Sequence, residues 1–352
     1  MRKKKEYNFA DNSFDYIRLF AALMIVLGHS SVHLEYNIPR WLSFIQGRTV
    51  GLYCLFAISG YLISASYERA KSNKEYICKR IVRLYPGLFG AFGLSLLCVL
   101  IFGMGVANQH YGIAQLFVWS IAQVTFFQFF TPSAVKSYAT GNPNGSLWTI
   151  SLEIQMYIII MLIWKWMKKQ KIVVWLMIIV GALMMNVVYP FTANLLPPIV
   201  HKLIGVSFIP YAFVFLIGMF VYAKKETVIP FLANNFWKVG GVYAFWCIVN
   251  SFIFRVQIGH YTDIITGILI PMVVFAGAYR FGKHKLKHDL SYGIYLYHMI
   301  IVNAFYVLGW KNNLFALVVV FIISIVLSFV SCVFVEEPVI LKYRQHLKDD
   351  RR

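Results

Sequence analysis

The feature that most constrains this chain is a series of apolar runs, each close in length to the thickness of a bilayer core. About 20 residues of helix cover the roughly 30 Å of hydrocarbon. Eleven runs fill most of the 352 residues, at 15–33, 48–66, 86–107, 112–130, 146–167, 172–190, 201–222, 236–254, 262–281, 290–308 and 313–335. Lipid offers no partners for unpaired backbone groups, and the alternating segments of a membrane barrel are missing from the sequence. The pattern therefore predicts an all-α polytopic membrane protein.

The charge balance limits how many of these runs can cross. The chain has 33 Lys and Arg against 14 Asp and Glu, a net charge of +19, which is compatible with nucleic acid, anionic lipid or membrane topology. If all eleven runs crossed from a cytoplasmic N-terminus, the lysines of 165–171 would lie outside, against the positive-inside rule. If 112–130 stays on the outer side, 26 of the 33 basic residues face the cytoplasm. We therefore expect about ten transmembrane helices, one outer interfacial or re-entrant segment, cytoplasmic termini and no nucleic-acid partner.

Three regions follow from this topology. A basic cytoplasmic tail over 1–13 precedes a transmembrane domain over 14–338, and a second basic cytoplasmic tail covers 339–352. The long outer loop, 108–145, holds the non-crossing segment and a turn-rich stretch at 141–145.

Ionisable groups inside membrane helices are costly and usually functional, which selects Arg18, His29, Glu153 and His298. Arg18 and His29 are eleven residues apart, about 16 Å along one face of a helix. An imidazole titrates near neutrality and can accept a proton from a hydroxyl, so His29 is the candidate general base. Glu153 is expected at a similar depth, where its carboxylate could orient the His29 ring. The alternatives are a histidine bonded to a backbone carbonyl and a structural ion pair or protonated carboxyl at Glu153.

Arg80 and Arg83 lie one helical turn apart before the third apolar run. Arginine binds phosphate bidentately, so with Arg18 they could form a phosphate site at the inner mouth. The alternative is that this charge run only orients the protein and binds lipid headgroups.

Six further residues are candidates for contact with the substrate or its passage: Ser59, Gly60, Trp148, Ser151, Tyr295 and His298. Ser59 and Gly60 are small, which permits either a passage or close helix packing. Trp148 is also a normal interfacial anchor. We expect no metal, because the sequence has no intramembrane cluster of His, Cys, Asp and Glu at ligand spacing.

Several short motifs occur in a fixed order across the chain. They are Arg18-x10-His29, Ile58-Ser59-Gly60-Tyr61-Leu62, Arg80-x-x-Arg83 with Pro86, Leu147-Trp148…Glu153, Ser291-Tyr292…His298 and Glu337-Pro338. Together they resemble acyltransferase family 3 over 14–338. The family's motif residues fall on Arg18, His29, Arg80 and Arg83. Tyr61, Thr149 and Tyr297 stand where Phe, Ser and Trp are common, and none of these departures removes an ionisable group.

The resemblance implies a membrane O-acyltransferase of the O-acetyltransferase type. Such enzymes move an acyl group from cytoplasmic acyl-CoA to a hydroxyl of a cell-surface glycan, polysaccharide or lipid-linked sugar, and they hold no permanent cofactor. The arginines would hold the CoA phosphates while the pantetheine arm extends toward His29. An acyl-histidine intermediate is a second route that the sequence leaves open.

The resemblance also implies a location and partners. A bacterial inner membrane is expected, with membrane lipids, acyl-CoA and a carbohydrate or glycolipid acceptor as partners. Many relatives carry a fused hydrolase-like domain, whereas here a basic tail follows the motifs. We therefore expect the chain to act alone or with a separate extracytoplasmic acyl-handling partner.

A different class of protein would use the same ionisable residues. A transporter or exporter of a polar metabolite or glycan could place Arg18, His29 and Glu153 along its pathway as relay groups. The two halves of the sequence lack the hydropathy symmetry that inverted repeats would give, which argues against a transporter.

Overall fold

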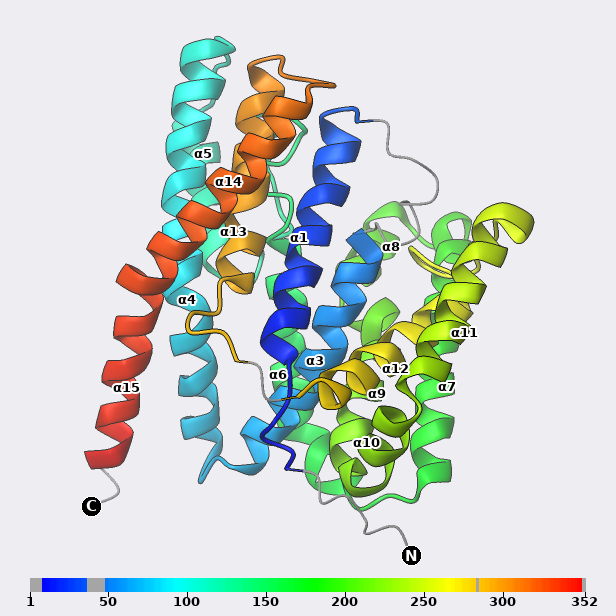
Figure 1. Ribbon diagram of the computed structural model, residues 1–352. Helices are drawn as coiled ribbons and strands as arrows, with labels where there is room; N and C mark the ends of the chain where they lie inside the picture. The colour runs from blue at the N-terminus through cyan, green and yellow to red at the C-terminus, as the bar shows by residue number, and fades with distance from the viewer. Residues whose placement is uncertain (1–7, 37–47, 283–284, 350–352) are drawn as a thin grey trace, which may run out of the picture.

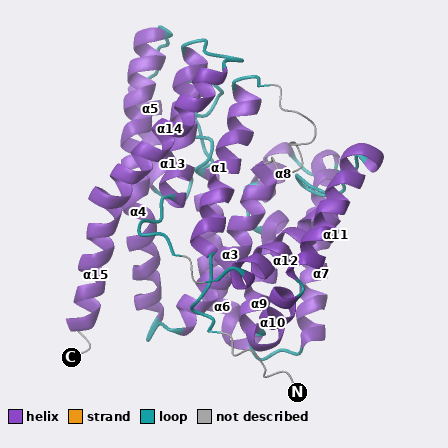
Figure 2. Cartoon of the chain, viewed as in Figure 1, coloured by secondary structure: helices purple, strands orange, loops and turns teal. Residues whose placement is uncertain are grey.

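The computed structural model describes residues 8–36, 48–282 and 285–349, and over these residues the chain is helical, without strands (Figure 2). The predicted all-α fold class is confirmed. The basic residues of 2–5, counted above in the cytoplasmic tail, lie outside the described residues.

Seven helical stretches among the described residues are long and apolar enough to cross a membrane, or eight if a pair bent by 43° counts as one span. The seven are α1 (Phe14–His33), α3 (Arg48–Glu68), α4 (Asn73–Cys98) with η1 (Val99–Val106), α6 (Trp148–Met167), α7 (Ile172–Val188) with η3 (Tyr189–Asn194), α11 (Phe236–Val249) with η5 (Asn250–Phe254), and α14 (Leu314–Ser331) continued by η6 (Cys332–Glu336) and α15 (Glu337–Asp349). The bent pair joins α8 (Pro198–Gly205) to η4 (Ile209–Tyr211) and α9 (Ala212–Ala223). This is an integral membrane protein.

Shorter helices make up the remainder. They are α5 (Ile113–Val124), η2 (Val135–Ser137), α10 (Lys225–Asn234), α12 (Ile264–Arg280) and α13 (Ser291–Val307). At 12 residues, α5 rises only about 18 Å, too little to cross the hydrocarbon core. It occupies the run that the charge argument excluded from crossing. α12 and α13 have 17 residues each, at the lower limit for a crossing.

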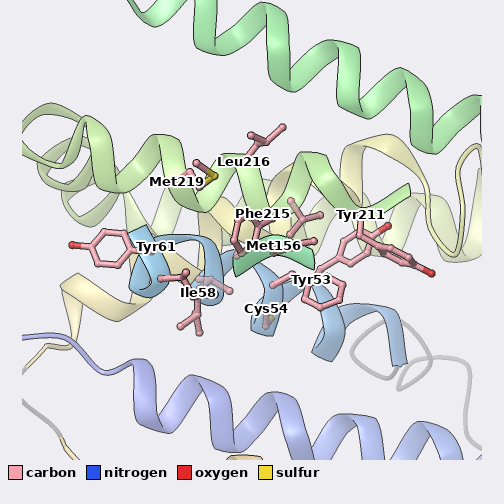
Figure 3. Close-up of a cluster of buried hydrophobic side chains, with 14 of the residues drawn as sticks. Tyr53, Cys54, Ile58, Tyr61, Met156, Tyr211, Phe215, Leu216 and Met219 are labelled. Atoms are coloured by element: carbon pink, nitrogen blue, oxygen red, sulfur yellow. The ribbon is translucent and has the colours of Figure 1, made fainter. Parts of the chain in front are cut away.

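The core is built around α3, which packs against α1, α9 and α12. Figure 3 shows α3 beside α9, with Ile58 and Tyr61 of α3 and Phe215 and Met219 of α9 in one buried cluster. The two helices approach until their backbones touch. A Cβ atom added to Gly60 would lie 2.1 Å from the Phe215 carbonyl oxygen, and one added to Gly218 would lie 2.1 Å from the Ala57 carbonyl oxygen. Small residues permit such a crossing where packing, not water, drives helix association.

α13 is the second central helix. Every residue from Ser291 to Phe305 is buried, and the helix packs against α1 and α14. Figure 1 shows α1, in blue, between α13 and α3. A helix buried on all faces can hold polar side chains away from lipid, and the buried residues of α13 include His298, Asn303 and three of its four tyrosines.

The segment predicted as a basic tail over 339–352 is helical as far as Asp349. It continues α14 through the π-helical turn η6 and contacts α4, beside which it runs in Figure 1. A part of the chain expected to be an appendage thus belongs to the packed helical body.

The close crossing of α3 and α9 predicts that one added methyl group at Gly60 destabilises the protein. Gly60→Ala should lower the free energy of unfolding by about 1–3 kcal/mol, because the added Cβ forces the two backbones apart. The measurement is thermal unfolding of the purified protein in detergent. Gly241→Ala on α11 is the matched control, since nothing lies within 4 Å of its Cβ position. Equal effects at the two positions would contradict the close crossing.

Candidate active site

A cavity of about 790 Å³ lies among α1, α3, α4, α6, α13 and α15. Six of the candidate residues from the sequence line it: Arg18, Ser59, Arg80, Arg83, Glu153 and Tyr295. Residues far apart in the chain therefore share one space, of a size typical of small-molecule sites.

The wall of the cavity is strongly cationic. Its basic residues are Arg18, Arg69, Lys79, Arg80, Arg83, Lys287 and Arg344, and its acidic residues are Glu153, Asp289 and Glu337. Seven cations against three carboxylates, enclosed by apolar helices, attract an anionic ligand.

Asp289 holds two of these arginines. Its Oδ2 atom lies 2.8 Å from an Nη of Arg18 and 2.8 Å from an Nη of Arg83, while its Oδ1 accepts hydrogen bonds from the backbone and hydroxyl of Ser291. Burial opposes ionisation of the carboxyl, but the two arginine charges and the Ser291 donors outweigh it and lower its pKa from 3.8 to about 2. Asp289 is therefore charged at any physiological pH and joins α1, α4 and the start of α13.

Arg80 and Arg83 share a face of α4 but have different partners. Arg83 also lies 3.7 Å from the buried carboxylate of Glu336. Arg80 donates to the Ser66 hydroxyl at 2.8 Å, and its guanidinium stands 5.7 Å from the centre of the Tyr157 ring. The buried Nε of Arg80 has no hydrogen-bond partner in the described part of the chain. Arg80 therefore keeps a donor that an anion could use.

His29 and His298 form an imidazole pair. Nδ1 of His29 lies 2.8 Å from Nε2 of His298, and the ring centres are 5.0 Å apart. Nδ1 of the fully buried His298 lies 2.9 Å from the Tyr295 carbonyl oxygen and 3.2 Å from that of Ile294.

These contacts set both tautomers. A carbonyl oxygen only accepts, so His298 carries its proton on Nδ1 and presents a lone pair at Nε2. His29 must then donate from Nδ1, which leaves the lone pair of its neutral ring on Nε2. That is the protonation state that a general base requires.

Tyr295 connects the imidazole pair to the cavity. It lines the cavity, precedes His298 by less than one helical turn, and its ring centre lies 6.0 Å from that of His298. Its hydroxyl is 2.5 Å from that of Thr149 and donates to the Ser146 carbonyl at 2.9 Å. The cavity therefore runs from the arginines to Tyr295, which lies beside His298, although neither His29 nor His298 lines the cavity.

Glu153 lies on the cavity wall, where its carboxylate accepts a 2.6 Å hydrogen bond from Tyr157. A carboxylate that orients the His29 ring would accept a hydrogen bond from Nδ1, but this nitrogen is already hydrogen-bonded to His298. The orienting group is thus a neutral histidine on α13, and the role of Glu153 remains a prediction.

The remaining candidates lie outside the cavity lining. Gly60 faces α9, which favours close packing, the alternative left open by the sequence. The ring of Trp148 packs 5.4 Å from that of Tyr211. The buried Ser151 hydroxyl lies 2.7 Å from the Phe126 carbonyl oxygen, so it fastens the segment after α5 onto α6.

One group of possible metal ligands occurs in the described residues. Donor atoms of His288, Cys332 and Glu337 lie within 4.8 Å of one another. Glu337 accepts hydrogen bonds from His288 at 2.9 Å and from Cys332 at 3.4 Å. Hydrogen bonding accounts for these contacts, and the absence of a metal remains a prediction.

The sequence reading missed Asp289, Glu336 and Arg344. Asp289 had a local signal, because an acidic residue two positions before the first residue of a helix suits its N-terminus. Nothing local indicated that it binds Arg18 and Arg83, which are distant in sequence. Glu336 directly precedes the motif Glu337-Pro338, which was used only to identify the family resemblance. Arg344 lies in the region 339–352, which was predicted to be a cytoplasmic tail.

Comparison with known proteins identifies the family. The acyltransferase domain of family 3 matches residues 11–336. The chain belongs to acyltransferase family 3. This membership favours the first of the two classes considered above: the protein is an enzyme, an acyltransferase.

Several characterised relatives are similar to this acyltransferase. Nodulation protein 10 of Rhizobium leguminosarum is 25% identical and covers 93% of this chain and 92% of its own length. The O-acetyl transferase of Shigella phage Sf6 is 33% identical over 42% of this chain and 44% of its own. The peptidoglycan O-acetyltransferase OatA of Listeria monocytogenes is 22% identical over 83% of this chain, which spans about half (49%) of that protein. No solved structure matches significantly.

The Asp289 network makes a pH-dependent contribution to the stability of the acyltransferase. Because the folded-state pKa of Asp289 lies below its ordinary value, the stabilisation is present above about pH 4 and is lost as pH falls toward 2. A shift of nearly two pKa units corresponds to about 2 kcal/mol. The free energy of unfolding of wild type should exceed that of Asp289→Asn by at least this amount at pH 6, and the gap should narrow at pH 3. A gap that stays constant with pH would contradict the network.

Proposed function

We propose that this acyltransferase is an O-acetyltransferase that moves an acetyl group from cytoplasmic acyl-CoA to a hydroxyl of a cell-envelope glycan, in a bacterial inner membrane. The observation that carries the proposal is the cationic cavity, which is lined by three arginines and by Tyr295, whose ring lies 6.0 Å from that of His298 in the His29–His298 pair. The relatives named O-acetyltransferases support the acetyl group and the glycan acceptor.

The membrane arrangement in this proposal has ten crossings with both termini in the cytoplasm. α12 and α13 each cross, and α5 stays on the outer side because it is too short to span. The arginines of α4 then lie toward the cytoplasm, where acyl-CoA is made, and His29 lies in the outer half of its helix. The acyl group crosses most of the membrane inside the protein, bound to its donor.

The donor lies along α1. Arg80 and Arg83, with Arg18, line the cavity and hold the CoA phosphates. The pantetheine arm follows α1 toward His29, about 16 Å beyond Arg18 by helix rise. The thioester is thereby brought to the Tyr295 end of the cavity.

Transfer then requires one base and one leaving group. Nε2 of His29 takes the proton from the acceptor hydroxyl as its oxygen attacks the thioester carbonyl carbon. The new C–O bond forms, the C–S bond breaks, and the CoA thiolate takes the proton from His29. His298 holds the His29 ring through Nδ1 during both steps, and the charge of Glu153 favours the transient imidazolium.

Supply of labelled acetyl-CoA to inverted membrane vesicles tests the function. Label should enter the glycan or glycolipid fraction, and His29→Ala should lower the rate by about 10²–10⁴-fold, the usual contribution of a general base. His110→Ala, at an exposed histidine outside the cavity, is the control and should keep the rate. Transport of glycan across the vesicle membrane without incorporation of label would contradict the proposal. Label retained on the protein without acceptor would indicate the acyl-histidine route.

The tautomer argument predicts different effects for two substitutions at His298. His298→Ala removes the acceptor for His29 Nδ1–H, so kcat should fall about 100-fold or more while KM for acyl-CoA stays close to wild type. In His298→Gln, the side-chain Oε1 can accept the hydrogen bond from His29 Nδ1–H, so this variant should keep much of the wild-type kcat. Equal loss in both variants, at equal thermal stability, would contradict the positioning role.

A further inference from the structure

The cavity has a wall that the family comparison does not cover. The family match ends at residue 336, whereas the cavity continues along the next helix. The lining residues of α15 are Glu337, Ile340, Leu341, Tyr343, Arg344 and Leu347. The catalytic steps above use none of them.

The start of α15 is held in place. Glu337, its first residue, accepts a hydrogen bond at 2.9 Å from His288, which fastens the helix to the segment before α13. It accepts a second at 3.4 Å from Cys332 in the preceding turn η6. α15 also contacts α4, the helix that carries Arg80 and Arg83. The lining side chains of α15 therefore have a defined position opposite the arginines.

The inward face of α15 combines apolar, aromatic and cationic groups. Ile340, Tyr343 and Leu347 recur at helical spacing and are half-buried, in contrast to the exposed residues between them. Arg344 lines the same cavity, and Lys287 lies on its wall from the segment before α13. A flat ring stacks on such a tyrosine face, and phosphate binds the neighbouring cations.

We propose that α15 binds the nucleotide end of the acyl donor, the adenosine 3′-phosphate of CoA. The adenine lies on the face formed by Tyr343, Ile340 and Leu347. Arg344 and Lys287 hold the 3′-phosphate. This inference rests on the proposed use of acyl-CoA and extends it to a specificity determinant outside the family's shared segment.

The spacing along the chain fits two separate phosphate positions. Glu336 lies 3.7 Å from Arg83, and Arg344 follows it by eight residues, about 12 Å of helix. The long side chains of Arg83 and Arg344 can therefore reach two phosphate groups of one bound nucleotide. In this arrangement, Arg80 and Arg83 bind the pyrophosphate and Arg344 binds the 3′-phosphate.

The test compares CoA with 3′-dephospho-CoA, which lacks only the phosphate assigned to Arg344. Dissociation constants are measured on the full-length protein in lipid nanodiscs. Wild type should bind CoA about tenfold or more tightly than 3′-dephospho-CoA, the scale of a charge-assisted hydrogen bond. Arg344→Ala should abolish this preference by weakening CoA alone, and unchanged 3′-dephospho-CoA binding shows that the variant is folded.

Lys342→Ala is the matched control. It removes the same charge from the same helix, but two residues from Arg344 place it about 200° around the axis, away from the cavity. It should leave both affinities unchanged. Tyr343→Ala should weaken both ligands, and Tyr343→Phe, which keeps the ring, should weaken neither.

The possible results distinguish failure of the α15 site from failure of the proposed function. If wild type binds CoA and transfers acetyl but does not distinguish CoA from 3′-dephospho-CoA, the α15 site is wrong and the proposed function stands. Equal losses in Arg344→Ala and Lys342→Ala would also overturn the site. If wild type binds no CoA, the donor assignment fails and the inference fails with it.

Discussion

The arrangement of this site depends on one carboxylate, Asp289. Its two oxygen atoms engage Arg18 on α1, Arg83 on α4 and Ser291 at the start of α13. A guanidinium in a membrane helix needs a partner, because burial of an unpaired charge is very costly. One acidic group thereby fixes the relative positions of three helices and keeps two arginines on the wall of the cavity.

The same helix that begins beside Asp289 carries the second half of the site. α13 is buried from Ser291 to Phe305, so its polar groups must be satisfied by the protein. His298 meets this need through the carbonyl oxygens of its own helix on one side and His29 on the other. The requirement that buried polar groups be bonded thus produces, as a consequence, a defined tautomer at His29. The proposed mechanism uses the same hydrogen bonds that satisfy these buried groups.

The sequence predicted much of this because some signals are local. Runs of about 20 apolar residues need no partner to be recognised, and each of the eleven contains a helix. The charge distribution singled out 112–130, where α5 is too short to cross. Arg18, His29, Glu153 and His298 were selected because ionisable groups are rare in apolar helices, whereas Arg80 and Arg83 were selected because they lie one helical turn apart. Pairings were harder, since the carboxylate expected at His29 lies instead beside Tyr157, and His298 takes its place.

By itself, the sequence determined the class of the protein, its helical content, its family and some of the ionisable residues of the site, because each of these is written in composition, periodicity or a short motif. Only the tertiary structure decided which residues meet. The Asp289 network and the His29–His298 pair each join residues more than 200 positions apart in the chain. Within the region 339–352, which was predicted to be a tail, five residues between 340 and 347 line the cavity because α15 packs against α4. The physical reason is that a hydrogen bond or an ion pair depends on angstrom-scale distances between side chains, and helix packing, which no local pattern encodes, sets those distances.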